Sequence, residues 1–384
     1  WLSKRIEWHL LGNHLFTNAK ALLFGSLFFL EKDEIIFKKS IRIINDQIKE
    51  QVLNDGAHFE LSTMYHSIFL EDILDIINIS HQFPEKFKKH DINLWKETAS
   101  KMMFWLKNFT HSDGDIAFFN DSAFSIASKT DDLYKYMASL NINDIVNKQS
   151  EIKLNSFEDS GYISIKSNNI DLFIDVAKIG PDYLPAHAHA DTLSFELSYQ
   201  NYRVFVNSGT SSYENQSQKR NAQRSTAFHN TLSIDNQNSS DVWASFRVGR
   251  RAKPKNLEIC EDEGSINISC SHDGYSYLKF KPIHTRKWRF ENNILNISDH
   301  VSSNFYDCHA NYILHPDIMI DDVSSDRLKI ILPNDTILSL IFIGAKIEVI
   351  DHAYAHKFGD EIKTKSIKVI NAHNYTCKIL NLYP

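Results

Sequence analysis

Two histidines separated by one alanine, His187 and His189, lie in the stretch of the chain that is richest in side chains able to do chemistry. Asp191 follows at the same spacing, and His229 comes forty residues after His189. On an extended strand, side chains two apart point to the same side, so these first three are expected to share one face. Two imidazoles and an oxygen donor can hold a divalent cation. Hydrogen-bonded polar residues would produce the same spacing, so both interpretations stay open.

A second group of polar residues lies in the N-terminal part of the chain. Asn13 and His14 stand in an otherwise apolar helical stretch, and a turn that contains His58 leads into a helical stretch that contains Tyr65. A buried amide needs a hydrogen-bonding partner, so Asn13 could serve either helix packing or ligand binding. Tyr65 shares a helical stripe with apolar residues, and an ordinary core tyrosine is the alternative to a functional one.

The elements that must position these residues change type near residue 150. Before it, apolar residues recur at helical spacing, which predicts helices over 1–30, 33–53, 61–80, 93–109 and 131–140. After it, apolar and polar residues alternate in many short runs between turn signals, as in strands. The helices must pack on one another as a bundle, solenoid or toroid. We therefore predict an α+β protein with an all-α domain over 1–150 and an antiparallel β-sandwich over 151–384.

Composition limits the possible partners. The chain has 384 residues and a formal net charge of −6, so its overall charge does not favour binding to nucleic acid. The longest apolar run, 21–30, is too short to span a membrane. The four cysteines lack the paired spacing of a metal site and do not suggest a disulfide-rich scaffold. They leave the cellular compartment open.

Five motifs, taken in order along the chain, resemble those of the heparinase II/III-like polysaccharide lyases, a family that includes alginate lyases of the same architecture. The motifs are Asn13-His14, the run from Asp55 through His58 and Glu60 to Tyr65-His66, the run from His187 to Asp191, the run from Asn207 to Tyr213, and the run from Arg224 to Thr231. The resemblance covers nearly the whole chain. It implies an (α/α) toroid followed by an antiparallel β-sandwich, with the active site in the cleft between them. The helical part is short for such a toroid, so we expect the toroid to be incomplete at its N-terminal side.

The resemblance also implies a reaction, the β-elimination of a uronic-acid-containing acidic polysaccharide. A lyase of this kind removes the C5 proton, which is α to the carboxylate, and expels the C4 oxygen, so it needs a base, an acid and a group that stabilises the developing charge. By the resemblance, Asn13 binds the substrate carboxylate with His14 beside it, and Tyr65 and His187 are the acid and base. The residues expected to bind substrate are His58, Tyr213 and Arg224, with Lys219 as an alternative to Arg224.

A structural zinc ion is the cofactor that the resemblance implies. His189 and His229 match two of its ligands, and Asn207 stands where relatives have an aspartate. A neutral amide oxygen is a weaker zinc ligand than a carboxylate, so either the site is weakened or Asp191 takes over this role. A substrate of this class favours a periplasmic or secreted protein.

Two other functions stay open on the sequence. A carbohydrate-binding or surface-polysaccharide assembly protein could keep the lyase scaffold without catalysis, and Asn207 gives this alternative some weight. A hydrolase would need two carboxylates, such as Glu60 and Asp191, at a defined separation. We expect the partners to be acidic polysaccharides or oligosaccharides, with no nucleic acid and no membrane span.

Overall fold

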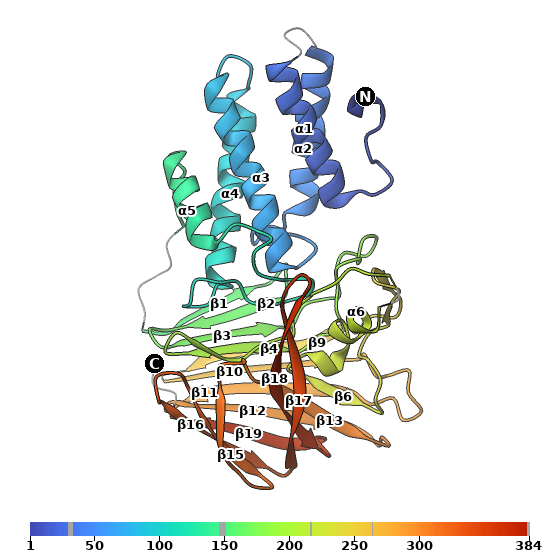
Figure 1. The fold of residues 1–384 in the computed structure, drawn as a ribbon, viewed down its shortest axis with the longest axis vertical. Helices are drawn as coiled ribbons and strands as arrows, with labels where there is room; N and C mark the ends of the chain where they lie inside the picture. Colours follow the sequence, from blue (N-terminus) through green and yellow to red (C-terminus); the bar gives the residue numbers. More distant parts are fainter. Residues whose placement is uncertain (30–33, 146–150, 216, 263, 382–384) are drawn as a thin grey trace.

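The computed structural model describes residues 1–29, 34–145, 151–215, 217–262 and 264–381. Helices occupy the N-terminal part and antiparallel sheets most of the remainder (Figure 1), which confirms a mixed α+β protein. The toroid and the sandwich stay predictions. None of the helices in the described ranges is both long and apolar enough to cross a membrane.

The longer helices all lie in the N-terminal part. They are α1 (Gly12–Phe28), α2 (Glu34–Gln51), α3 (Thr63–Gln82), α4 (Lys89–Asn108) and α5 (Thr130–Ser139). Most of their buried apolar residues form one cluster, which includes Leu70 and Trp95. Ser62 caps α3, because its side-chain oxygen accepts a hydrogen bond from the backbone N–H of Tyr65 at 3.1 Å. This cap fixes the start of α3 and places Tyr65 in its first turn.

The first helix begins later than the sequence pattern predicts. Before Gly12 the chain forms only a short 3-10 turn, η1 (Leu2–Lys4). Leu11 and Gly12 have positive φ angles of 59° and 51°, which a right-handed helix does not continue through. A Cβ added at Gly12 would lie 2.7 Å from Leu184 and 3.2 Å from Glu60. The start of α1 therefore packs closely against the loop that leads to the histidine pair.

Three larger antiparallel sheets form the β part. The first has the order β1-β2-β3-β4-β5, with β1 (Lys153–Phe157), β2 (Tyr162–Lys166), β3 (Ile170–Asp175), β4 (Phe195–Tyr199) and β5 (Tyr202–Phe205). The second has the order β14-β15-β16-β19-β12-β11-β10-β9, with β9 (Pro254–Asp262), β10 (Ser265–His272), β11 (His284–Glu291), β12 (Ile294–Val301), β14 (Met319–Val323), β15 (Arg327–Ile331), β16 (Ile337–Ile343) and β19 (Asn374–Leu380). The third has the order β17-β18-β13-β6, with β6 (Leu232–Ile234), β13 (Cys308–Ile313), β17 (Lys346–Lys357) and β18 (Asp360–Ile370). The elements between β5 and β9 also include α6 (Gln218–Gln223), η2 (Thr226–Phe228) and a ribbon of β7 (Val242–Trp243) and β8 (Arg247–Val248).

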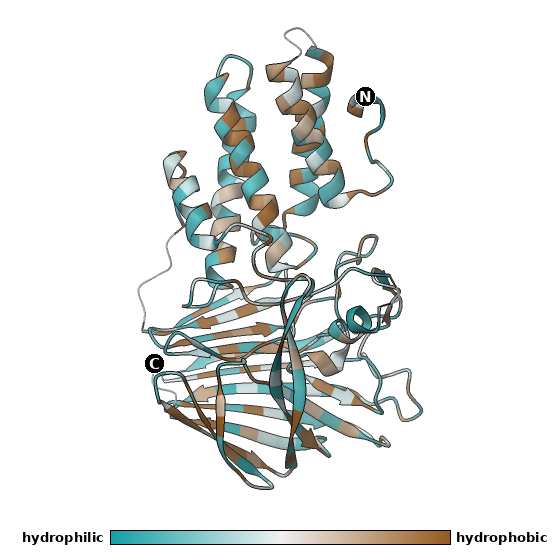
Figure 2. Ribbon diagram, viewed as in Figure 1, coloured by the Kyte–Doolittle hydropathy of each residue, from teal (hydrophilic) through white to brown (hydrophobic). Residues whose placement is uncertain are grey.

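One hydrophobic core joins the three sheets. Its buried side chains include Phe195 of the first sheet, Trp288 of the second and Tyr312 of the third. Apolar and polar residues alternate along many of these strands (Figure 2), as expected when one face of a sheet meets the core. A separate aromatic cluster, which includes Trp105 of α4 and Phe173 of β3, packs the helical part against the first sheet. This cluster fixes the two parts at the junction where the candidate site lies.

The histidine pair lies in the loop between β3 and β4, and the prediction that a strand carries it is wrong. The carbonyl of Pro185 accepts a hydrogen bond from the N–H of Ala188 at 3.1 Å, which closes a turn at this point. The N–H of Ala190 donates to the carbonyl of Arg224 at 2.9 Å, outside any sheet ladder. The loop, and not the alternation of a strand, therefore sets where the two imidazoles point.

Candidate active site

The candidate active site lies where loops of the helical part meet loops of the first sheet. Tyr65 stands in the first turn of α3, Asp121 in the loop between α4 and α5, and His187 in the loop between β3 and β4. Tyr213 comes from the loop after β5, and Arg220 comes from α6. Each side chain is thus supplied by a different segment, and the packing of the two parts brings them together.

Tyr65 contacts two aromatic neighbours. Its hydroxyl oxygen lies 3.1 Å from that of Tyr213, within hydrogen-bonding distance, and its ring centroid lies 4.1 Å from the ring centroid of His187. Burial raises the pKa of Tyr65 well above its ordinary value. The phenol therefore keeps its proton at neutral pH and is suited to donate it.

His187 is held by Asp121 at one ring nitrogen. Its Nδ1 lies 2.8 Å from Oδ2 of Asp121, and the backbone N–H of Asp121 donates to the carbonyl of His187 at 3.1 Å. Because the carboxylate accepts the proton on Nδ1, a neutral ring carries its lone pair on Nε2. Nε2 lies 3.9 Å from Oε2 of Glu60, which is beyond hydrogen-bonding distance. This arrangement suits His187 as a general base.

Asp121, which the sequence pattern did not single out, connects most of this site. Besides His187 it binds His189, whose Nε2 lies 2.8 Å from Oδ1, and Arg220, which donates through both terminal nitrogens. Thr210 adds a hydrogen bond at 3.2 Å. Burial opposes the charge on Asp121, but Arg220 and the two histidines outweigh it and hold the pKa of Asp121 well below its usual range. One buried, ionised carboxylate therefore orients both histidines.

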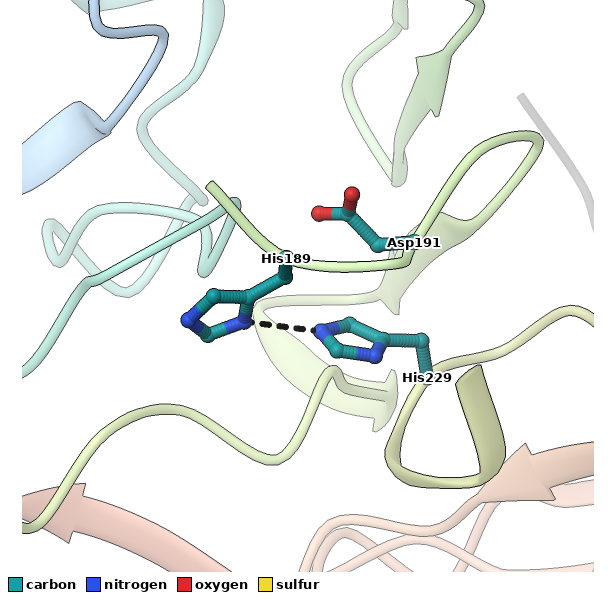
Figure 3. A group of neighbouring side chains, drawn as sticks. All are labelled: His189, Asp191 and His229. Atoms are coloured by element: carbon teal, nitrogen blue, oxygen red, sulfur yellow. Dashed lines mark hydrogen bonds between the residues drawn. The ribbon is translucent and has the colours of Figure 1, made fainter. Parts of the chain in front are cut away.

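His189, Asp191 and His229 come together in a buried group with metal-binding chemistry (Figure 3). One ligand atom from each lies within 4.8 Å of the other two, and Nδ1 of His189 lies 3.1 Å from Nε2 of His229. Two nitrogen ligands of a tetrahedral zinc ion, each at about 2.0–2.1 Å from the metal, stand about 3.3 Å apart. Oδ2 of Asp191 is buried with no hydrogen-bond partner in the described part of the chain. The donor types and the spacing of the two nitrogens fit a zinc ion, and Asp191 offers a third donor within 4.8 Å of both.

Burial sets the charge state of this group. It lowers the pKa of His189 to about 3 and also lowers that of His229, so both rings are neutral and can offer lone pairs. It raises the pKa of Asp191, which a bound cation would reverse by favouring the carboxylate. The contact between His189 and Asp121 has the form of the carboxylate–histidine pair that orients a zinc-bound imidazole.

Asn207, predicted as a metal ligand, has its amide engaged elsewhere. Its Nδ2 donates to the carbonyl of Phe118 at 2.9 Å, and its Oδ1 accepts a hydrogen bond from the backbone N–H of Asn230 at 3.2 Å. The side chain thus ties the loop after β5 to two other segments. Asp191 replaces it as the third candidate ligand.

Arg224 and His58, predicted to bind substrate, are buried residues with partners inside the protein. Arg224 has no exposed surface, and its guanidinium donates to the carbonyls of Ala188 and Ser245 at 2.9–3.0 Å. His58 is 1% exposed, and its Nε2 lies 3.1 Å from Oε1 of Gln51. Both assignments stay predictions, although neither side chain is exposed to a ligand in this structure. Arg224 holds the histidine loop in place.

Asn13 and His14 lie in the first turn of α1, which packs on Glu60. Oδ1 of Asn13 accepts a hydrogen bond from the backbone N–H of His14 at 3.0 Å, and the exposed ring of His14 lies 3.4 Å from the carboxylate of Glu7. Burial raises the pKa of Glu60, and its Oε2 lies 3.9 Å from Nε2 of His187. Glu60 therefore connects the start of α1 to the candidate site.

Two family models match this chain. The model of the heparinase II/III N-terminus matches residues 2–146, and the model described as heparinase II/III-like, C-terminal, matches residues 151–379. Their boundary falls between α5, which ends at Ser139, and β1, which begins at Lys153.

Curated relatives of the chain are named heparin-sulfate lyases. One from Bacteroides stercoris is 28% identical over 254 residues, which cover 59% of this chain and 36% of the relative. One from Pedobacter heparinus is 26% identical over 270 residues, which cover 65% of this chain and 39% of the relative. The chain thus spans well under half the length of these relatives.

Solved structures resemble the chain over nearly its whole length. A heparan sulfate lyase from Pedobacter heparinus has a TM-score of 0.77 at 18% identity, with 99% of this chain and 61% of that chain covered. A chondroitinase AC lyase has a TM-score of 0.55 at 9% identity, with 97% and 61% covered. At these identities the likeness shows the fold. The family models cover both the helical and the β part, and the chain belongs to the heparinase II/III-like family.

Proposed function

We propose that this chain carries the catalytic site of a polysaccharide lyase, which cleaves a uronic-acid-containing acidic polysaccharide by β-elimination. The observation that supports this most is the contact between Tyr65 and His187, whose ring centroids are 4.1 Å apart at the junction of the helical and β parts. One is a protonated phenol and the other is an imidazole oriented by a buried carboxylate, so the pair offers the acid and the base that an elimination requires.

The proton transfers follow from the state of each group. Nε2 of His187 takes the C5 proton of the uronate, and the electron pair of the broken C–H bond forms the C4–C5 double bond. The C4–O bond breaks at the same time, and the phenol of Tyr65 gives its proton to the leaving oxygen. Asp121 stabilises the imidazolium that forms, since it already accepts the proton on Nδ1 at 2.8 Å.

The substrate carboxylate needs a hydrogen-bond donor, because negative charge builds on it as the C5 proton leaves. We assign this role to the amide of Asn13, with His14 beside it, as the resemblance to the family implies. The side chains of both residues are partly or fully exposed in the first turn of α1. Tyr213 is placed to support Tyr65 through the contact of their hydroxyls.

A zinc ion held by His189, Asp191 and His229 would have a structural role in this account. Bound there, it would supply a fixed positive charge that neutralises Asp191 and joins the loop between β3 and β4 to the segment after η2. His189 lies two residues from His187 and shares Asp121 with it. A bound ion that fixes His189 would therefore also help to hold His187, the base, in position.

The names of the relatives make heparan sulfate and heparin the first polymers to test. The full chain would be incubated with heparan sulfate, heparin, hyaluronan and alginate while ultraviolet absorbance is followed, because an unsaturated uronate absorbs and the intact polymer does not. We expect a rise with at least one polymer and none with Tyr65→Phe. Binding of an acidic glycan with no rise for any polymer would overturn the lyase and leave a glycan-binding protein on a lyase scaffold.

A further inference from the structure

A hollow of about 700 Å³ lies on the sheet formed by β17, β18, β13 and β6. We call it the sheet-face hollow. The residues that give it its chemistry are Phe228, His309, Asn311, His352, Lys363 and Lys368. Tyr65, His187 and Tyr213 do not line it. It is therefore distinct from the candidate active site, and its size is that of a pocket for a small ligand.

Two lysines, Lys363 and Lys368, line the hollow, and Glu348 stands opposite Lys368 in the ladder of β17 and β18. Lys363 and Lys368 both come from β18, and neither forms an ion pair within the described ranges. Asp351 also lines the hollow and forms an exposed ion pair with Lys365 at 2.6 Å. The whole chain carries a net charge of −6, so two unpaired lysines at one hollow are a local departure that favours an anionic ligand.

Neutral polar groups and an aromatic ring accompany the lysines. His309 is 7% exposed, and its Nδ1 makes no hydrogen bond within the described part of the chain, although Oδ2 of Asp307 lies 3.5 Å away. Nε2 of His352 lies 2.9 Å from the hydroxyl oxygen of Ser208, and its ring centroid lies 4.5 Å from that of Phe228. Lysines beside a buried polar ring and an aromatic face match a sugar that carries sulfate or carboxylate groups.

The hollow is connected to the candidate active site through the hairpin of β17 and β18. The two strands run from the third sheet toward the helices (Figure 1), and Phe358 at their turn lies 4.8 Å, centroid to centroid, from Tyr213. Phe228, which lines the hollow, directly precedes His229 of the candidate metal group. One hairpin thus contributes residues to the hollow and, at its turn, a contact to Tyr213.

We propose that the sheet-face hollow is an accessory binding site for an acidic saccharide unit of the polysaccharide. This choice of ligand rests on the proposed function. The benefit of such a site is a higher effective concentration of the polymer at the candidate active site, since a chain bound at two points leaves either point less readily. A short fragment that cannot reach both sites would gain nothing from it.

The test compares binding by three full-length proteins that all carry Tyr65→Phe, so that the probe stays intact. The probe is a fluorescently labelled heparin oligosaccharide, and anisotropy reports its affinity. We expect Lys363→Gln with Lys368→Gln to weaken binding about tenfold or more, because two charge-assisted contacts are lost. Lys346→Gln removes the same type of charge from an exposed position on β17 outside the hollow, and it should bind like the parent.

Two results would overturn the accessory site: equal affinity of the double variant and its parent, or an equal loss in Lys346→Gln. A labelled single-stranded oligonucleotide is the control for the ligand. If it binds the parent as tightly as the saccharide does and loses as much affinity in the double variant, the saccharide is overturned as the ligand. The proposed function is judged separately, by unsaturated product from the protein with native Tyr65. If the double variant loses binding but the protein with native Tyr65 forms no unsaturated product, the accessory site is supported and the lyase function is contradicted.

Discussion

Asp121 lies 2.8 Å from Nδ1 of His187, and its other carboxylate oxygen lies 2.8 Å from Nε2 of His189. One side chain thus orients the candidate base and a candidate metal ligand. Arg220 binds the same carboxylate and is itself fully buried. Any change at Asp121 is therefore expected to affect catalysis, metal binding and stability together.

Asp121→Asn should lower kcat by about 10²- to 10⁴-fold, because an amide cannot stabilise the imidazolium of His187 as a carboxylate does. It should also destabilise the fold by about 3 kcal/mol, since the charge of Arg220 would stay buried without its partner. Initial rates on the best polymer and thermal unfolding measure the two effects. Asp131→Asn, on the exposed side of α5, is the control. A kcat near that of the native protein would show that Asp121 does not orient the base.

Tyr65→Phe should reduce kcat by at least about 10³-fold, because it removes the proton donor and leaves the ring in place. Tyr213→Phe removes only the hydroxyl that meets Tyr65 at 3.1 Å, so we expect a loss of about tenfold. Tyr306→Phe changes an exposed tyrosine and should have no effect. Equal losses in the Tyr65 and Tyr213 variants would contradict the assignment of Tyr65 as the acid, and circular dichroism would verify that each variant is folded.

Sequence periodicity was sufficient for much of the fold because the helices and strands are amphipathic. The switch from helices to strands near residue 150 agrees with α5, which ends at Ser139, and β1, which begins at Lys153. The predicted start of the first helix, at residue 1, was wrong, because the helix begins at Gly12. Hydropathy does not reveal the positive φ angles at Leu11 and Gly12. The family was confirmed, and it was the order of several weak motifs that indicated it.

The site was less accessible to sequence reasoning because loops supply most of it. Asp121 follows the apolar run Ala117-Phe118-Phe119 in a stretch with no helical or strand period, and only the fold shows that two histidines converge on it. Arg224, expected to bind substrate, is buried against backbone carbonyls, which the sequence does not reveal. Long-range contacts decide such cases, and a linear pattern does not encode them.

Zinc analysis tests the group of His189, Asp191 and His229. The full chain, purified without chelator, should contain about one zinc ion per chain, and Asp191→Asn should lose most of it. Removal of the ion should lower the melting temperature, because a ligand at 100 times its Kd adds about 2.7 kcal/mol to the folded state. Asn207→Ala should keep the metal and lose only stability. Loss of zinc in Asn207→Ala but not in Asp191→Asn would restore Asn207 as the ligand.

Glu196 in β4 should contribute to the pH dependence of the free energy of unfolding. Its Oε2 lies 2.8 Å from Nε2 of His111, and burial raises its pKa to about 8, against a normal value of 4.5. The folded protein therefore keeps a proton that the unfolded chain loses between these values. Stability that is present below pH 4.5 is lost as the pH rises toward 8.

Glu196→Gln stays neutral at every pH, so its melting temperature should fall less than that of the native protein between pH 5 and 8. Thermal unfolding in matched buffers measures the difference between the two proteins across this range. Glu97→Gln alters an exposed residue of α4 and should run parallel to the native protein. If the melting temperatures of Glu196→Gln and the native protein differ by the same amount at every pH from 5 to 8, the Glu196 carboxyl does not titrate in this range.

The most direct test of the central claim is the fate of solvent oxygen during cleavage. The native chain would digest its best uronic-acid polymer in water labelled with heavy oxygen, and mass spectrometry would read the products. Elimination by Tyr65 and His187 adds no water, so we predict unsaturated ends without label and no product from Tyr65→Phe. Products whose non-reducing ends are all saturated, each heavier by one added water than the unsaturated product, would contradict the account, because they would identify the reaction as hydrolysis.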